Sequence, residues 1–282
     1  MKRLFSIELQ KIWKNRASRV LTISYFLLLT LLSLIAAIKF DIGPIHIELS
    51  EQGIFNFPYI WHFNSYIAAL LKIFLAVVIV SMMANEYSYG TLKQNLIDGM
   101  GKKEFVISKF LTVVFFAAIS TLFVFVVSLI LGIIFSDFNE IGIIFSELEF
   151  LLAYFVKLVG FFSFCLFLGI LIKRSAFAIG FLFIWSIIEG ISYGILKFKI
   201  FDGTNNKHSF VDTIYQFFPL ESMSNLLVEP FSRLKFVKTM QSQIGIENIK
   251  DYSVHWYSIA IVLAWTAIFI FLSYYIIKKR DL

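Results

Sequence analysis

The sequence predicts an all-α polytopic membrane protein. Six apolar stretches fill the 282-residue chain, and each is near or above the ~20 residues that a helix needs to cross a bilayer. The composition is 59% hydrophobic and only 16% charged, which is atypical of a soluble domain of this length. The stretches cover residues 20–38, 66–83, 110–135, 150–172, 176–196 and 256–277. We therefore expect a single transmembrane domain over residues 1–282 with six membrane-spanning helices.

The first of these stretches follows a mixed, charged segment. Residues 4–19 place Leu, Phe, Ile and Trp among Lys, Arg, Glu and Gln, which predicts an amphipathic helix on the inner headgroup surface. The alternative is a basic flank that only sets topology. A signal peptide is disfavoured because the charged segment comes first and no clear small-x-small cleavage site follows the apolar run.

The basic residues predict the orientation, because Lys and Arg in short segments near helix ends face the cytoplasm. The loop 136–149 instead holds four acidic residues and no basic one, as expected outside. Both termini are therefore predicted to be cytoplasmic, and anionic lipid headgroups account for the net charge of +6 without nucleic acid. The basic residues are Lys2, Arg3, Lys11, Lys14, Arg16 and Arg19, then Lys93, Lys102, Lys103 and Lys109, then Lys173 and Arg174, and finally Lys278, Lys279 and Arg280.

Two further exterior segments follow from this topology. Residues 39–65 contain Gly and Pro and are too short for a folded domain, so we expect a lid or a connector. Residues 197–255 are longer and mix aromatic, aliphatic and acidic residues. We expect them to form short amphipathic helices that dip into the bilayer rim or cap a cavity, where protein or water satisfies their backbone.

The most informative feature is the cytoplasmic loop between the second and third spans. It begins with Glu86-Tyr87-Ser88-Tyr89-Gly90-Thr91-Leu92-Lys93-Gln94-Asn95-Leu96-Ile97. We predict a short amphipathic helix that starts near Tyr87, a turn at Gly99 to Gly101, and a basic re-entry into the membrane. The loop should protrude into the cytoplasm with a mixed surface.

This loop resembles that of the permease subunits of type-2 ABC exporters (the ABC-2 type transporter superfamily). Their second-to-third loop commonly has Glu, then Gly-Thr-Leu, a turn, a basic residue, and Lys before the third helix. Glu86, Gly90-Thr91-Leu92, Lys102-Lys103 and Lys109 occupy the matching positions. The turn differs, since the family often has proline and arginine where this chain has glycines and lysines. The six spans and the long exterior segment are also similar to the family.

The resemblance implies a coupling helix that sits in a groove of a separate ABC ATP-binding subunit, in a bacterial cytoplasmic (inner) membrane. A second permease subunit, either the same chain or a related one, completes such a transporter. The alternative is an interfacial loop that rests on lipid. Aromatic anchors with a charged rim suit an interface. The implied coupling residues are Glu86, Tyr87, Tyr89, Gly90, Thr91, Leu92 and Leu96.

The chain is not predicted to be an enzyme. It contains no Gly-x-x-x-x-Gly-Lys-Ser/Thr phosphate loop, so ATP and Mg would be bound by the partner subunit and not by this chain. It also has no His-Glu-x-x-His metal motif and no Gly-x-Ser-x-Gly nucleophile elbow. We therefore expect no cofactor, catalytic residue or metal site in this chain.

Three ionisable residues interrupt the spans, namely Lys72, Lys157 and Glu189. At ~1.5 Å per residue, all three lie ~10 Å below the outer surface. Charges inside a membrane tend to face protein or water, so we expect Glu189 to pair with Lys157 or Lys72. The alternative is that each lysine extends separately to the headgroups.

Three functions remain open at this level. The first is a permease subunit that moves substrate by alternating access, driven by ATP on a partner. The second is an ion-coupled secondary transporter or channel, although the inverted repeats or broken helices that would favour it are not apparent. The third is a membrane scaffold or immunity protein that transports nothing. The sequence does not identify a substrate.

Overall fold

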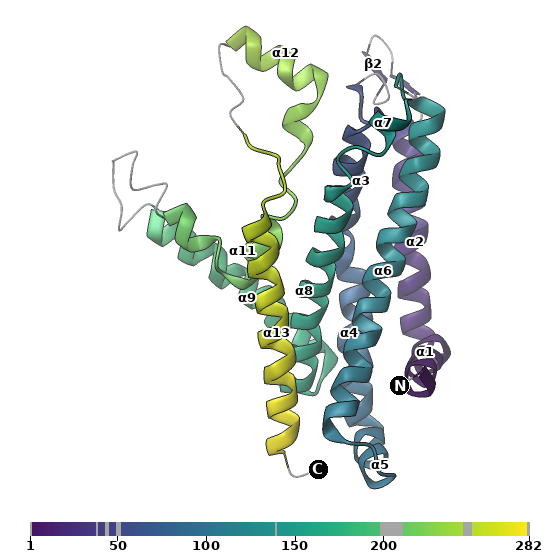
Figure 1. Cartoon of the computed structure of the whole chain (residues 1–282), viewed down its shortest axis with the longest axis vertical. Helices are drawn as coiled ribbons and strands as arrows, with labels where there is room; N and C mark the ends of the chain where they lie inside the picture. Colours follow the sequence, from purple (N-terminus) through teal and green to yellow (C-terminus); the bar gives the residue numbers. More distant parts are fainter. Residues whose placement is uncertain are drawn as a thin grey trace.

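The computed structural model describes residues 2–37, 39–42, 45–48, 52–138, 140–197, 211–244 and 250–280. The molecule consists of long helices, most of which run side by side along its longest axis, whereas the helix Ser175–Ile195 leans away from the others (Figure 1). Five of them are long and apolar enough to cross a membrane. These are α2 (Arg16–Ala37), α6 (Lys102–Phe135), α8 (Glu149–Ile172), α9 (Ser175–Ile195) and α13 (Trp256–Lys279).

The second predicted span, residues 66–83, is not one continuous helix. Helix α3 (Tyr59–Leu70) and helix α4 (Lys72–Ser88) meet at Leu71, and they pass the same length and hydropathy test only as a pair bent by 46°. At the bend the Leu71 N–H donates to the Ala68 carbonyl, three residues back, which is the tightened turn of a helix end. The protein is thus a multi-pass membrane protein, and its described residues contain five candidate spans, or six if the bent pair is one span.

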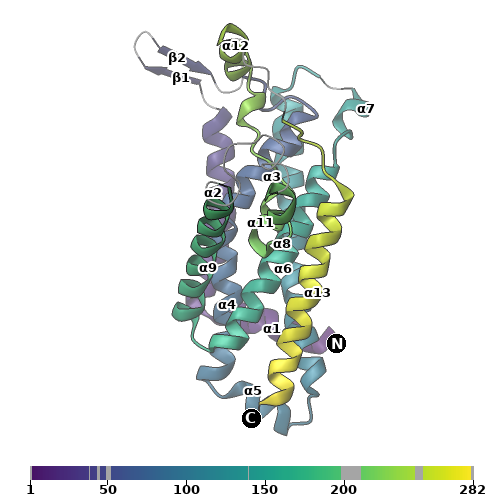
Figure 2. The same cartoon turned by 90° about the vertical axis from the view of Figure 1, so that its left-hand side faces the viewer.

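The N-terminal segment is a helix, but it is shorter than predicted. Helix α1 (Lys2–Lys14) ends before Asn15, and α2 starts at Arg16. The Asn15 side chain accepts a hydrogen bond from the Ser18 N–H at 3.1 Å, which satisfies one of the free donors in the first turn of α2. Helix α1 lies across the lower part of the bundle (Figures 1 and 2).

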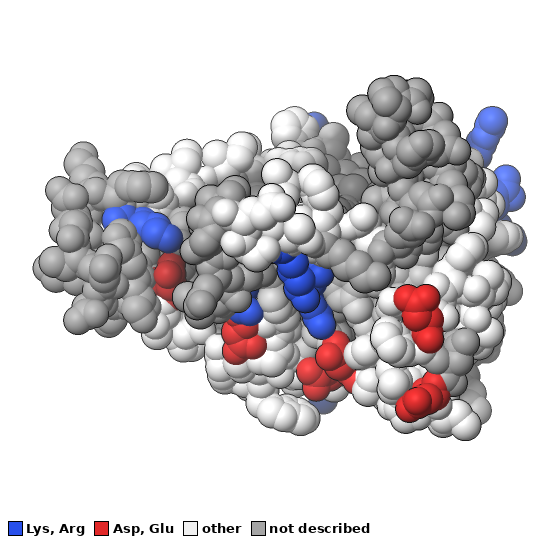
Figure 3. Space-filling model, turned by 90° about the horizontal axis from the view of Figure 1, so that it is seen from above, with Lys and Arg blue, Asp and Glu red and all other residues white. Residues whose placement is uncertain are grey.

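The connections at the two ends differ. One end carries α1, α5 (Thr91–Ile97) and both ends of the described chain, as expected for an even number of crossings (Figure 1). At the other end, the strands β1 (Lys39–Ile42) and β2 (Ile45–Glu48) form an antiparallel hairpin. The sequence predicted a lid or a connector in this region, without strands. The short helices at or below that end are α7 (Ile141–Ile144), α11 (Pro219–Ser224), the 3₁₀ turn η3 (Phe231–Arg233) and α12 (Lys235–Ile244). Seen from above, that end shows acidic and basic side chains together (Figure 3).

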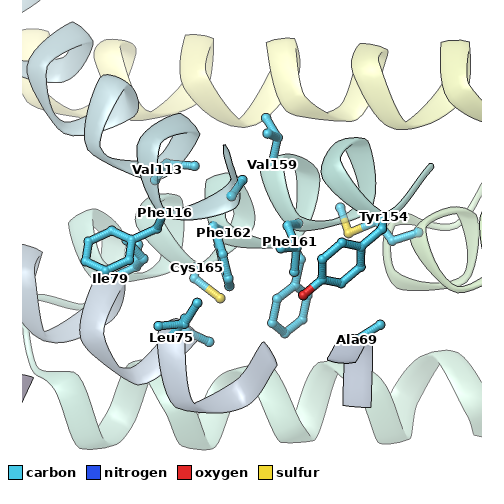
Figure 4. Packing of buried hydrophobic residues seen from close by; sticks show 14 of the residues in the cluster. Ala69, Leu75, Ile79, Val113, Phe116, Tyr154, Val159, Phe161, Phe162 and Cys165 are labelled. Carbon is cyan, nitrogen blue, oxygen red and sulfur yellow. The ribbon is translucent and has the colours of Figure 1, made fainter. Parts of the chain in front are cut away.

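Helix α8 is the centre of the bundle, in contact with α3, α4, α6, α9, α11 and α13. Its Phe162 and Cys165 are fully buried and lie near Leu75 and Ile79 of α4 (Figure 4). The Tyr154 hydroxyl bonds to the hydroxyls of Tyr25 and Ser120, at 2.7 and 2.8 Å, and so links α8 to α2 and α6. A buried hydroxyl is stable only when it has a hydrogen-bond partner, so these three hydroxyls favour the one arrangement of α2, α6 and α8 in which they meet.

Candidate functional site

A buried lysine holds together the elements around the loop that connects α4 to α6. Lys109 lies in the early part of α6, and its relative exposure is 0%. Its ammonium donates to Glu8 Oε2 of α1 at 2.5 Å and to Glu86 Oε1 near the end of α4 at 2.5 Å. Both carboxylates are also buried. One side chain thus joins three helices that are far apart in the sequence.

Lys11 of α1 adds a second cation. Its ammonium lies 2.9 Å from Glu86 Oε1 and 3.6 Å from Glu8 Oε1. Two carboxylates and two ammonium groups make the cluster neutral, and we call Glu8, Lys11, Glu86 and Lys109 the charge tetrad. Buried charges are tolerated when they are paired and hydrogen-bonded, and removing one partner leaves a costly unpaired charge.

The pKa of Lys11 agrees with this pairing. Burial disfavours its charged form, but the hydrogen bond to Glu86 and the negative charges of Glu8 and Glu86 outweigh burial and raise the pKa above its ordinary value. Lys11 therefore stays protonated at neutral pH. A pocket of about 350 Å³, lined in part by Asn15, Asn85, Thr91 and Lys11, opens beside the tetrad, so water reaches its α1 side.

The tetrad also fixes the start of the loop helix. The chain turns between α4 and α5 at Gly90, whose φ of 67° lies in the left-handed region that favours glycine. Thr91, the first residue of α5, donates its hydroxyl to Glu86 Oε2 at 2.5 Å. The two oxygens of Glu86 therefore connect α5 on one side with Lys11 and Lys109 on the other.

This geometry corrects the predicted loop. The helix begins at Thr91 and not near Tyr87, because α4 continues to Ser88. Leu92 is only 2% exposed and packs in the core, and Leu96 is partly buried against it. Leu92 and Leu96 therefore hold the loop helix against the bundle, and neither of them forms its exposed side.

Tyr87 is likewise turned toward this chain. Its hydroxyl accepts a hydrogen bond from Arg280 Nη1 at 2.9 Å. The same guanidinium donates to the Ile170 carbonyl at 2.6 Å and to the Leu171 carbonyl at 2.9 Å. Arg280 thus links the end of α13 to the ends of α4 and α8. The two carbonyls of α8 that it binds lie in the last turn, where backbone carbonyls have no donor within their own helix.

The exposed side of the loop consists of other residues. Tyr89 and Ile97 are each 74% exposed, and Lys93 and Gln94 between them are also exposed. Tyr89 was among the predicted coupling residues, whereas Ile97 was only the end of the predicted loop. The exposed side of the loop thus presents one aromatic, one aliphatic and one basic side chain at separate positions along it.

The sequence reasoning missed both partners of Glu86, Lys11 and Lys109, and it missed Glu8 as the second carboxylate of the tetrad. Lys109 was interpreted as part of a basic re-entry, and Lys11 as part of a lipid-facing helix. The available signal was Glu8, the one acidic residue within the basic first 19 residues. An acid in such a segment invites a search for the cation that it pairs with.

The three intramembrane charges do not meet as predicted. The Glu189 carboxylate accepts from Trp185 Nε1 at 2.5 Å and from the backbone N–H groups of Leu220 and Glu221 at 3.1 and 3.2 Å. Within the described ranges no ion pair joins it to Lys72 or Lys157. The expected pairing is therefore wrong in this structure, and the physical reason is that α11 inserts beside α9 and supplies backbone donors instead.

Each lysine has its own surroundings. Lys157 donates to the Ser224 carbonyl at 3.3 Å, at the end of α11. The Lys72 ammonium lies 4.7 Å from the centre of the Phe161 ring, as in a cation–π contact. Part of the predicted 197–255 exterior segment thus enters the bundle, because α11 contacts α8, α9 and α13.

We expect Glu189→Ala to release α11. The change removes the acceptor of two backbone N–H groups, which costs about 1–3 kcal/mol when they stay buried. Hydrogen–deuterium exchange of the detergent-solubilised protein should become faster in residues 219–224. Ser192→Ala is the control, because among the described residues that hydroxyl bonds to the Ile188 carbonyl of its own helix and to nothing in α11. Equal exchange in both variants would show that Glu189 does not hold α11.

Comparison with known proteins identifies a family. Residues 48–282 match the family described as Protein of unknown function (DUF2705). The chain belongs to this family. The DUF2705 match covers α3 to α13, and so includes Glu86, Thr91 and Lys109, whereas Glu8 and Lys11 precede it. No curated protein matches the chain.

Within the part of this DUF2705 protein that the structure describes, no three His, Cys, Asp or Glu side chains lie close enough to hold a metal ion. His62 is buried in α3, with Nε2 at 2.8 Å from the Val228 carbonyl and Nδ1 at 3.2 Å from Arg233 Nη1. Both of its nitrogens are thus engaged in packing the outer segment. The most extensive polar arrangement described above is the charge tetrad, which joins α1, α4 and α6 and is hydrogen-bonded to α5 through Thr91.

Proposed function

We propose that the chain is the membrane-spanning permease subunit of an ATP-driven exporter of the type-2 ABC kind. Its motor is a separate ATP-binding subunit that docks on α5. One observation carries this proposal: α5 and the turn before it lie at the end of the bundle, with Ile97 of α5 and Tyr89 of the turn exposed, while Thr91 at the start of α5 is hydrogen-bonded to Glu86 of the charge tetrad. A docking element needs such an exposed face and a rigid base.

The tetrad supplies the mechanical path in this proposal. A displacement of α5 pulls on Glu86, and Glu86 is ion-paired to Lys11 of α1 and Lys109 of α6. Helices α1, α4 and α6 therefore respond together. ATP shifts the permease between states only if the docked subunit binds nucleotide differently in each of them. The partner binds ATP and Mg, a second permease subunit faces this one, and the complex resides in a bacterial cytoplasmic membrane.

The exposed side of the loop, formed by α5 and the turn before it, is tested by a double variant, Tyr89→Ala with Ile97→Glu. Because both side chains are mostly exposed, the fold should tolerate the change. We expect the wild-type chain, solubilised from its native membrane, to co-purify with an ATP-binding subunit, and the double variant to lose at least 90% of it. Mass spectrometry of the purified material identifies and quantifies the partner.

The matched control is Ile141→Glu in α7, an apolar side chain that is as exposed but lies at the opposite end of the bundle. It should retain the partner at the wild-type level. A wild-type chain that purifies without any ATP-binding protein would refute the proposal and favour an ion-driven transporter or a scaffold. Equal loss in the control would also refute docking through α5.

A further inference from the structure

A groove lies where α1 packs against α2 and α6. It has a volume of about 880 Å³ and is lined by α1, α2 and α6. Helix α1 lies across the lower part of the bundle (Figures 1 and 2), near the ends of the candidate spans, so we expect the groove to open at the headgroup region. It lies outside the bundle core and belongs to neither the tetrad nor α5.

The walls of the groove are hydrocarbon. Ile23 and Leu27 of α2 face Phe115 and Ile119 of α6. Two threonines also line it, but both hydroxyls are used within α2: Thr22 donates to the Ser18 carbonyl at 2.8 Å, and Thr30 donates to the Phe26 carbonyl at 2.9 Å. The described part of the wall therefore offers few free polar groups, and an apolar chain suits it best.

The rim of the groove is polar and basic. It is formed by Ser6, Gln10 and Lys14 of α1. Lys14 is exposed and has no acidic partner among the described residues. Glu8, the only acid of α1, is already neutralised by Lys109. The rim thus carries an uncompensated positive charge beside a hydrocarbon slot.

We propose that this groove binds one anionic phospholipid of the inner leaflet. One acyl chain fills the slot between α2 and α6, and the phosphate meets Lys14 at the rim. Trp13, which lines the groove and is more than half exposed, sits where amphipathic rings anchor at the interface. The bound lipid braces α1, the helix that contributes Glu8 and Lys11 to the tetrad. This site does not depend on an ATP-binding partner.

The test uses the purified full chain in detergent, titrated with phosphatidylglycerol or phosphatidylcholine and observed by native mass spectrometry. We expect one saturable phosphatidylglycerol and at least five-fold weaker retention of phosphatidylcholine. Ile119→Trp fills the slot and should abolish retention of the lipid. Lys14→Gln removes the charge and should reduce the preference for phosphatidylglycerol to less than two-fold.

Two controls separate the site from general lipid coating. Leu122→Trp adds the same ring on an exposed part of α6 outside the groove, and Lys93→Gln removes an exposed charge on α5. Both should bind phosphatidylglycerol as the wild type does. Equal retention of the two lipids by the wild type, undiminished binding by Ile119→Trp, or an unchanged preference in Lys14→Gln would each overturn the proposal.

Discussion

Replacing Lys109 with methionine should destabilise the protein by about 3–5 kcal/mol, the usual cost of removing one partner from a buried ion pair. Methionine keeps much of the side-chain volume, so the change mainly removes the ammonium that bonds to Glu8 and Glu86. Glu8, Glu86 and Lys11 then have a net negative charge, and the two carboxylates that carry it remain buried. Thermal unfolding of the detergent-solubilised protein should show a clearly lower midpoint than the wild type, and trypsin should cleave faster between α1 and α2.

The control for this prediction is Lys103→Met, which removes an exposed lysine from the same helix. It should leave the unfolding midpoint nearly unchanged, as is usual for surface substitutions. Adding Glu86→Gln to Lys109→Met restores the neutrality of the cluster and should recover part of the lost stability. The effects of two substitutions on the free energy of unfolding are not additive when both residues belong to one network. If Lys109→Met unfolded at the same temperature as Lys103→Met, the tetrad would not hold these helices together.

The spans were predictable because each is a local property of the sequence. A helix inside a bilayer satisfies its own backbone, so a long apolar run is sufficient to identify it. The ends of residues 110–135 and 150–172 agree with α6 and α8 at Phe135 and Ile172. The break at Leu71 was not predictable in this way, since no proline or glycine marks it.

The tetrad was only half predictable. Glu86 stands out because it belongs to a short motif, as does Thr91, its hydrogen-bond partner outside the tetrad, which follows five residues later. Lys109 and Glu8 are 101 residues apart, and Lys11 and Glu86 are 75 apart. Contacts at such separations leave no trace in local periodicity. For the same reason, the sequence marked Leu92 as a contact for a partner when tertiary packing buries it.

Glu189 shows a different limit of the sequence. Its position in an apolar run correctly indicated that it faces protein, and it is buried. Its partner was wrongly predicted because an isolated carboxylate can be satisfied by a lysine or by backbone N–H groups. The choice depends on where α11 lies, and nothing within α9 specifies that.

A leucine at position 169 should separate α8 from α4. A Cβ added to Gly169 lies 2.9 Å from Met83 Cβ and 3.4 Å from the Val80 carbonyl oxygen, and both atoms move only with the backbone of α4. Overpacking of this kind costs about 1–3 kcal/mol. Because Glu86 follows Met83 by less than one turn, the same shift should disturb the tetrad. The yield of monodisperse protein and its thermal midpoint should both fall.

The matched change is Gly180→Leu in α9, where an added Cβ meets nothing within 4 Å. Leucine favours helix over glycine by somewhat less than ~1 kcal/mol, so this variant should be as stable as the wild type or slightly more so. Opposite effects of one substitution at two helical glycines would show that close approach of α8 and α4 sets the position of Glu86. Equal midpoints for the two variants would mean that α4 is free to shift, and a rigid base for α5 would then need another source.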